Sequence, residues 1–223
     1  MRDMVNTSLK KIDGGLFIVF EGGEGCGKTT QSRMLTEWLG AQGYDILSTK
    51  QPGGDDGICK NIRSLILDPQ YFKQFSARAE FLLFMADKAQ HIDYVVKPAL
   101  SKGSIVISDR YNASTFAYQV AARHSCTREE FDFVSGYTLQ GFAPHFTFWL
   151  DVDPAVGLRR NSAVPSQQLR FEKEDIQFHT SVRNGYEEFF TKHTDPSRVL
   201  RVDANQSIDQ SHEIILEQIK KLF

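Results

Sequence analysis

The sequence predicts a three-layer α/β fold, in which a central five-stranded parallel sheet is flanked by helices. Apolar runs of strand length recur at 16–20, 44–48, 104–108, 146–151 and 198–202. Longer stretches with helical spacing lie between or after them, at 28–42, 76–100, 112–123, 127–140, 171–192 and 207–222. The runs LFIVF and SIVIS are nearly all apolar, as strands covered on both faces are. Strands that alternate with helices in this way indicate βαβ units.

The composition is typical of a globular chain. Of the 223 residues, 41% are hydrophobic and 24% are charged. We expect a flexible leader at 1–15, without the apolar segment of a secretory signal, and one domain at 16–223. The net charge of −2 argues against a general nucleic-acid binder, and no run of about 18 apolar residues predicts a membrane span. Cys26, Cys59 and Cys126 form no paired motif, so we expect a reducing, cytoplasmic setting.

The first strand-like run leads into EGGEGCGKTT at 21–30, which matches the pattern G-x-x-x-x-G-K-[ST]. Glycines allow main-chain N–H groups to curl around phosphate oxygens, and the helix that follows presents its positive end to the same anion. Lys28 adds a cation, and Thr29 offers a hydroxyl to Mg²⁺. We therefore predict a phosphate-binding loop, or P-loop, that holds ATP. Its residues are Gly22, Gly23, Glu24, Gly25, Cys26, Gly27, Lys28, Thr29 and Thr30.

The P-loop occurs in several classes of protein. GTPase switches also carry D-x-x-G and N-K-x-D motifs, and the sequence contains neither. Asp109 ends the apolar run before it, on the side of a parallel sheet where ligands bind. Its carboxylate is expected to hold Mg²⁺ with Thr29, directly or through water. The missing motifs argue against a GTPase switch and leave motor ATPases and small-molecule kinases open at this point.

Four further stretches narrow the choice: KQPGGDDG at 50–57, FLLFMADKAQH at 81–91, SDRYNASTFAYQ at 108–119 and PHFTFWLDVDPAVGLRR at 144–160. With the P-loop, and in this order, they make the sequence from about residue 16 onward resemble the thymidylate kinases. The resemblance implies a P-loop NTPase fold with a lid segment, and transfer of a phosphoryl group from ATP to dTMP in dTTP biosynthesis. It also implies Mg²⁺ as cofactor and a homodimer.

The resemblance assigns roles to individual residues around dTMP. Arg110 grips the acceptor phosphate, Glu24 accepts a hydrogen bond from the 3′-hydroxyl, and Phe84 stacks on the thymine ring. Ser114, Tyr118 and Gln119 lie near the base and the sugar. Lys50 and Lys88 stand where the family usually has arginine, on the phosphate side and at the base edge.

The resemblance also places a catalytic arginine either in the P-loop or in the lid. The P-loop of this sequence contains no arginine, so the lid, at about 159–171, should supply it. The candidates are Arg159, Arg160 and Arg170, and with Lys28, Asp109 and Arg110 they complete the predicted catalytic set. The lid is also expected to exclude water when it closes.

Two alternatives to a thymidylate kinase stay open at this point. Lysine lacks the planar fork of arginine, so Lys50 and Lys88 leave room for a kinase with a different nucleoside or nucleoside monophosphate acceptor. A catalytically silent nucleotide-binding protein is the second alternative, against which the intact Lys28, Thr29 and Asp109 argue.

Overall fold

The computed structural model describes residues 9–54, 56–71, 73–162, 171 and 174–222, and its centre is a five-stranded parallel sheet. The strand order is β2-β3-β1-β4-β5. The strands are β1 (Leu16–Glu21), β2 (Ile46–Lys50), β3 (Ile105–Asp109), β4 (Phe146–Asp151) and β5 (Val199–Asp203). The predicted sheet of five parallel strands is confirmed.

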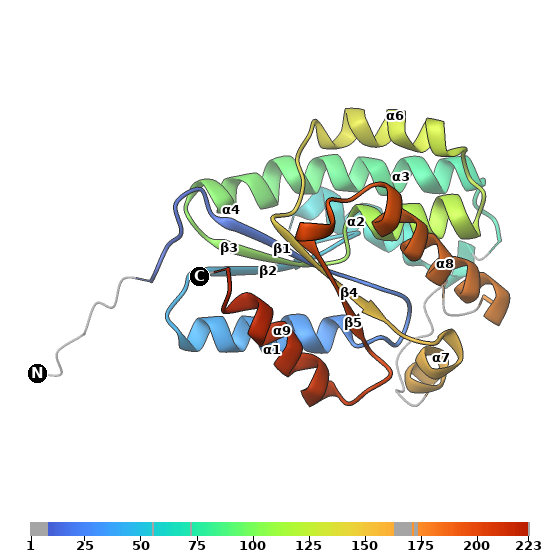
Figure 1. The fold of residues 1–223 in the computed structure, drawn as a ribbon. Helices are drawn as coiled ribbons and strands as arrows, with labels where there is room; N and C mark the ends of the chain where they lie inside the picture. Colours follow the sequence, from blue (N-terminus) through green and yellow to red (C-terminus); the bar gives the residue numbers. More distant parts are fainter. Residues whose placement is uncertain (1–8, 55, 72, 163–170, 172–173, 223) are drawn as a thin grey trace, which may run out of the picture.

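Helices cover both faces of this sheet (Figure 1). The α-helices are α1 (Lys28–Ala41), α2 (Gly57–Leu67), α3 (Ala77–His91), α4 (Lys97–Ser101), α5 (Asn112–Thr115), α6 (Arg128–Leu139), α7 (Pro154–Ser162), α8 (Ile176–Lys192) and α9 (Ile208–Ile219). Two π-helical segments, η2 (Ile92–Val96) and η3 (Phe116–Ala122), continue α3 and α5, and short 3₁₀ turns occur at η1 (Pro69–Tyr71) and η5 (Pro196–Arg198). Figure 1 shows α1 and α9 on one side of the sheet and α3, α4 and α6 on the other, so the three-layer architecture is confirmed.

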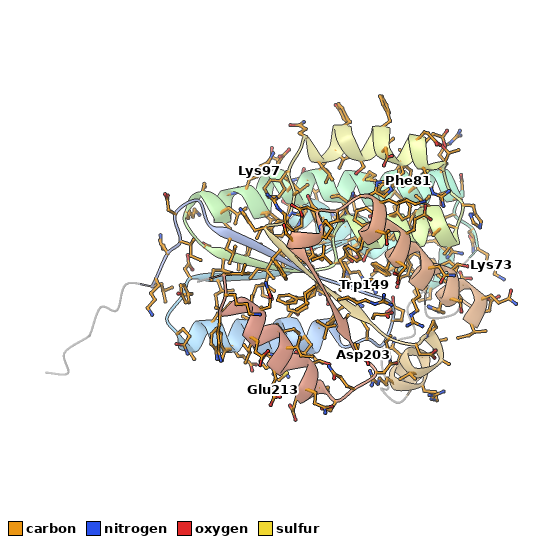
Figure 2. The ribbon with its side chains drawn as sticks, in the orientation of Figure 1. Lys73, Phe81, Lys97, Trp149, Asp203 and Glu213 are labelled. Carbon is orange, nitrogen blue, oxygen red and sulfur yellow. The ribbon has the colours of Figure 1, made fainter. Side chains whose placement is uncertain are left out.

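Side-chain alternation along the central strand explains why β1 is apolar from Leu16 to Phe20. Ile18 and Phe20 pack into the core beneath α1 and α9, whereas Phe17 and Val19 pack against η2 and α4. All four side chains are fully buried. Figure 2 shows the same division between inside and outside: Phe81 and Trp149 lie within the layers, and Lys73 and Glu213 lie on the surface.

Several element boundaries differ from the predictions. The strand expected at 44–48 is β2 at 46–50, because Tyr44 instead forms an isolated bridge with Lys10. Helix α2 was not predicted; the Asp56 carboxylate caps its first turn by accepting from the N–H groups of Ile58 and Cys59. The helix expected from 171 begins at 176, where Asp175 caps it in the same manner.

The described part of the segment before β1 is bonded to the domain through its main chain. The N–H of Lys10 donates to the Gly43 carbonyl at 2.7 Å, and the N–H of Ile12 donates to the Gly103 carbonyl at 2.9 Å. These hydrogen bonds attach the segment beside β2 and β3, away from the carboxyl ends of the strands.

The strand order places a ligand-binding edge at the carboxyl ends of β1 and β3. Phe20 is in register with Asp109, so the loops that leave β1 and β3 start side by side. From β1 the chain continues to β2, which pairs with the edge of β3 that faces away from β1. Strand β4 pairs with the opposite edge of β1. This reversal of strand order is where open α/β sheets bind their ligands. Among the described residues, none of the helices is long and apolar enough to cross a membrane.

Candidate active site

A cavity of about 830 Å³ opens at this edge of the sheet. Most of the residues predicted for the site line it: Glu24, Gly25, Cys26, Gly27, Lys28, Thr29, Thr30, Lys50, Phe84, Lys88, Asp109, Arg110, Ser114, Tyr118, Gln119 and Arg160. Gly22 and Gly23 belong to the same loop but do not line the cavity. Arg159 is exposed on α7 outside the cavity, and Arg170 lies outside the described residues.

The P-loop requires glycine for steric reasons at two positions. A Cβ on Gly22 would lie 2.3 Å from the Leu150 carbonyl oxygen, and φ at Gly22 is +145°. A Cβ on Gly25 would lie 2.0 Å from the Gly157 carbonyl oxygen. The loop is therefore pressed against β4 and α7. The Lys28 ammonium donates to the Gly23 carbonyl at 2.7 Å, so the cation lies over the loop that it follows.

Thr29 and Asp109 both line the cavity and are hydrogen-bonded to each other. The Thr29 hydroxyl donates to Oδ2 of Asp109 at 2.6 Å. Because α1 follows the P-loop and β3 pairs with β1, the first turn of the helix and the end of the strand converge here. Across the described part of the chain, no group of three or more His, Cys, Asp or Glu side chains could enclose a metal ion. Two oxygen ligands suit Mg²⁺, which usually keeps several waters and phosphate oxygens in its shell.

Arg110 connects the P-loop to the helices behind the cavity. Its guanidinium donates to Glu24 Oε1 at 2.6 Å and to the Gly22 carbonyl at 3.0 Å. It also donates to three hydroxyl groups, those of Ser114, Tyr118 and Tyr186, at 3.2–3.3 Å. The backbone of Arg110 is left-handed, with φ of +76°, which turns its side chain back over the loop.

Glu24 is the ion-pair partner of Arg110. Burial disfavours its charged form, but the charges of Arg110 and Lys28 and the hydrogen bond from the Tyr118 hydroxyl outweigh that cost and lower its pKa to about 2. The carboxylate is therefore ionised at neutral pH. A negative charge inside a phosphate-binding loop is explained by this pairing with the arginine.

Glu21, which holds the segment after Arg110 in place, was not predicted from the sequence as a site residue. Its carboxylate accepts hydrogen bonds from the N–H groups of Tyr111 and Ser114, at 2.8 and 3.1 Å, and from the Ser114 hydroxyl at 2.5 Å. The Tyr186 hydroxyl, from α8, bonds to Ser114 at 2.7 Å and to the Gly22 carbonyl at 3.0 Å. An acidic residue that ends a fully apolar strand is the signal that would have pointed to Glu21.

Aromatic rings surround the cavity at the end away from Lys28. The rings of Phe84 and Phe171 are 6.0 Å apart, and Tyr118 meets Phe171 edge-on at 5.6 Å. Phe171 is buried and lines the cavity, a position that was not predicted from the sequence. Lys88, only 2% exposed, lies one turn of α3 after Phe84 and also lines the cavity, and its ammonium lies 4.9 Å from the centre of the Tyr111 ring.

Arg63 is a further cation that sequence analysis missed, because α2 itself was not predicted. It lines the cavity and donates to the Pro52 carbonyl at 2.5 Å. Burial and the charge of Arg110 lower the pKa of Arg63, so the two guanidinium groups face a common region. Lys50 lies exposed at the end of β2, on the rim of the same cavity.

Arg160 lies at the opposite end, next to the loop between β5 and α9. Its guanidinium donates to the carbonyls of Ala204 and Asn205 at 2.7 and 3.2 Å. Gln206 and Ser207, from the same loop, also line the cavity. This end adjoins the P-loop and is well separated in the fold from the aromatic end.

Comparison with known proteins identifies the family. A family model described as thymidylate kinase matches residues 20–215. Thymidylate kinases of Cutibacterium acnes and Pelobacter propionicus are 41% and 39% identical over 209 and 210 residues, which cover 94% and 92% of this chain and 98% and 94% of theirs. That of Trichormus variabilis is 39% identical over 207 residues, covering 92% of this chain and 95% of its own. The chain therefore belongs to the thymidylate kinase family, whose members are nucleoside monophosphate kinases, as its sequence motifs predict.

Proposed function

We propose that this protein transfers the γ-phosphoryl group of ATP to dTMP, with Mg²⁺ as cofactor. The observation that carries the proposal is the pair of neighbouring residues at the end of β3. Asp109 bonds to Thr29 at the start of α1, and the neighbouring Arg110 bonds both to Glu24 of the P-loop and to the hydroxyl groups of Ser114 and Tyr118 on the other side of the cavity. A donor and an acceptor bound in the two halves would meet between them.

The P-loop half suits a triphosphate. The curled main chain of 22–27, the start of α1 and the Lys28 ammonium all present positive charge to it. Thr29 and Asp109 would hold Mg²⁺, which neutralises negative charge on the phosphates when bound. Arg160, Gln206 and Ser207 line the part of the cavity where the rest of ATP would lie.

The other half suits a nucleoside monophosphate. Arg110 and Arg63 would bind its phosphate, and the rings of Phe84 and Phe171 would enclose a base. The ionised Glu24 carboxylate would accept from a sugar hydroxyl. Ser114, Tyr118 and Gln119 complete this half, and Ser114 and Tyr118 also fix the Arg110 guanidinium.

Phosphoryl transfer between two phosphates asks the protein mainly for positioning and neutralisation of charge. Lys28 would stabilise the negative charge that develops on the transferred phosphoryl group. Arg110 would hold the attacking phosphate oxygen in line with that group. A lid arginine, from Arg159, Arg160 or Arg170, would add a further positive charge as the lid closes.

A panel of acceptors tests the proposal. Turnover is measured with ATP and Mg²⁺ against dTMP, dUMP, dCMP, dGMP and thymidine, with Lys28→Ala as the inactive control. We expect kcat/KM to be highest for dTMP. Higher kcat/KM for another acceptor would support the first alternative, and ATP binding without transfer to any acceptor would support a silent nucleotide-binding protein.

We also propose a cytoplasmic homodimer that pairs through α3 and α6. These helices lie side by side (Figure 1) and expose large apolar side chains: Leu82 is 49% exposed, and Phe133 and Tyr137 are each 80% exposed. Light scattering after gel filtration should give twice the monomer mass. A double substitution, Phe133→Ser with Tyr137→Ser, should give the monomer mass without unfolding the protein.

A further inference from the structure

The buried Lys88 ammonium belongs to a chain of hydrogen bonds that ends on β2. Lys88 Nζ donates to Gln51 Oε1 at 3.0 Å. The amide nitrogen of Gln51 lies 2.8 Å from Nδ1 of His91, and Nε2 of His91 lies 2.7 Å from the Thr49 hydroxyl. Gln51, Lys88 and His91 are at most 4% exposed. Three buried polar side chains thus join α3 to the end of β2.

The chemistry of the groups fixes the direction of this chain. An ammonium group has no acceptor, so the Gln51 oxygen must face Lys88 and the Gln51 NH₂ must face His91. Nδ1 of His91 then accepts, which leaves the ring proton on Nε2, where it donates to the Thr49 hydroxyl. Burial and the Lys88 charge lower the pKa of His91 to about 4, so the ring is neutral at physiological pH.

The surrounding backbone holds the same segment against α3. The N–H of Gly53 donates to Asp87 Oδ1 at 2.9 Å. A Cβ on Gly54 would lie 2.8 Å from Cδ2 of His91 and 3.0 Å from the Thr49 hydroxyl oxygen, so the chain passes directly over the imidazole. Asp87, Lys88 and His91 occupy neighbouring positions on one face of α3, and residues 51–54 are fastened to that face.

We propose that Gln51 and His91 are positioning residues for acceptor recognition, which hold the Lys88 ammonium against the aromatic end of the cavity through a one-directional hydrogen-bond chain. The inference rests on the proposed function, because the acceptor base would occupy that end. A held ammonium is a donor-only group. It favours a base that presents a carbonyl oxygen and disfavours one that presents an amino group.

The His91 tautomer tests the direction of the chain without any substrate. The full-length protein is labelled with ¹⁵N-histidine, and its ring nitrogens are assigned by through-bond correlation to the backbone. We expect a neutral ring with the proton on Nε2 from pH 6 to pH 8. A proton on Nδ1, or a cationic ring, would overturn the proposal.

A matched pair of variants tests the consequence for the acceptor. His91→Asn places a carbonyl oxygen near the position of Nδ1 and keeps an acceptor for Gln51. His91→Gln places its amide near Nε2 and keeps only the Thr49 contact. We expect the KM for dTMP to change less than about threefold in His91→Asn and to rise at least about tenfold in His91→Gln. A factor of about ten corresponds to the loss of one hydrogen bond from a chain that ends on a charged group. The KM for ATP should change in neither.

An equal effect of the two variants on the KM for dTMP would show that His91 acts only by packing, and would overturn the proposal. Gln51→Met, which keeps the length of the side chain and removes its amide, provides a second measurement. It should raise the KM for dTMP and reduce the preference for dTMP over dCMP. Wild-type turnover with dTMP tests the proposed function separately, so the two can fail independently.

Discussion

The Thr29 hydroxyl donates to the Asp109 carboxylate at 2.6 Å, although the two residues are 80 positions apart in the sequence. The parallel pairing of β1 with β3 brings them together, because it sets the P-loop and the end of β3 at the same edge of the sheet. The same pairing puts Arg110 one residue farther along, with its N–H bonded to the Phe20 carbonyl. One register thus brings together the two residues proposed to hold Mg²⁺ and the arginine proposed to bind the acceptor phosphate.

Asp109→Asn should weaken the use of Mg²⁺ while leaving the fold intact. The amide removes the negative charge that a divalent cation needs, so we expect the Mg²⁺ concentration for half-maximal rate to rise about 10- to 100-fold. Initial rates over a Mg²⁺ titration at saturating ATP and dTMP measure this. Thr29→Ser, which keeps the hydroxyl, is the matched control and should stay near wild type. An unchanged midpoint in Asp109→Asn would remove Asp109 from the metal site.

Glu24→Gln should lower stability and do so most at neutral pH. The folded-state pKa of Glu24, about 2, lies below the ordinary value of 4.5 for a glutamate, so its ion pair with Arg110 stabilises the fold above about pH 4.5 and that contribution is lost as the pH falls toward 2. We expect the free energy of unfolding at pH 7 to fall by about 1–3 kcal/mol. Urea unfolding at pH 7 and at pH 3 measures it, and an equal loss at both values would contradict the assignment.

Much of the site could be predicted from sequence because its parts are short motifs with a fixed local context. The P-loop and the Asp109-Arg110 pair each follow a strand, and the direction of a strand determines where its last residues lie. Tyr186 could not be predicted in this way: it reaches the Gly22 carbonyl from α8, 164 positions away, and only the packing of the helices brings it there. Arg63 depended on recognising α2, whose capping by Asp56 is a local signal that was available.

Asp151→Asn should destabilise the protein without changing how it binds its substrates. Asp151 ends β4 and accepts from both Arg183 and Arg201, at 2.7–3.2 Å. Burial opposes the charge of Asp151, yet the two arginines lower its pKa, so this contribution to stability is lost only as the pH falls through that lowered value. We expect the free energy of unfolding at pH 7 to fall by about 2–3 kcal/mol. This is less than for a fully buried ion pair, because both arginines are partly exposed.

Chemical unfolding checks the Asp151 prediction against a surface pair of similar composition. Arg198 and Asp195 form an exposed ion pair at 3.9 Å, and Arg198→Ala should cost less than about 1 kcal/mol. If Asp151→Asn cost no more than Arg198→Ala, the buried cluster would contribute no more than a surface contact does.

The three arginines of the proposed lid should differ in which kinetic constant they control. Because Arg160 is fastened to the carbonyls of Ala204 and Asn205, Arg160→Ala should raise the KM for ATP more than that for dTMP. Of Arg159→Ala, Arg160→Ala and Arg170→Ala, at least one should lose kcat by about 1,000-fold with little change in dTMP affinity, as removal of a transition-state contact does. Steady-state kinetics on all three decide it, and near-wild-type kcat in every variant would exclude lid catalysis.

Lys88 should make acceptor binding depend on pH in a range where arginine would not. Burial lowers the pKa of Lys88 to about 8, and the nearby Glu21 and Asp87 carboxylates offset only part of that effect. The ammonium is therefore charged below about pH 8 and neutral above it, so the KM for dTMP should rise between pH 7 and pH 9. In Lys88→Arg the guanidinium stays charged throughout this range, and the KM should stay flat. The free energy of unfolding of the wild type should increase over the pH range in which acceptor binding weakens. The lysine titrates at 10.5 in the unfolded chain, so unfolding takes up a proton between about pH 8 and pH 10.5. The folded state therefore gains stability as the pH rises through this range. Parallel pH profiles of KM in the wild type and Lys88→Arg would show that the titrating group is not Lys88.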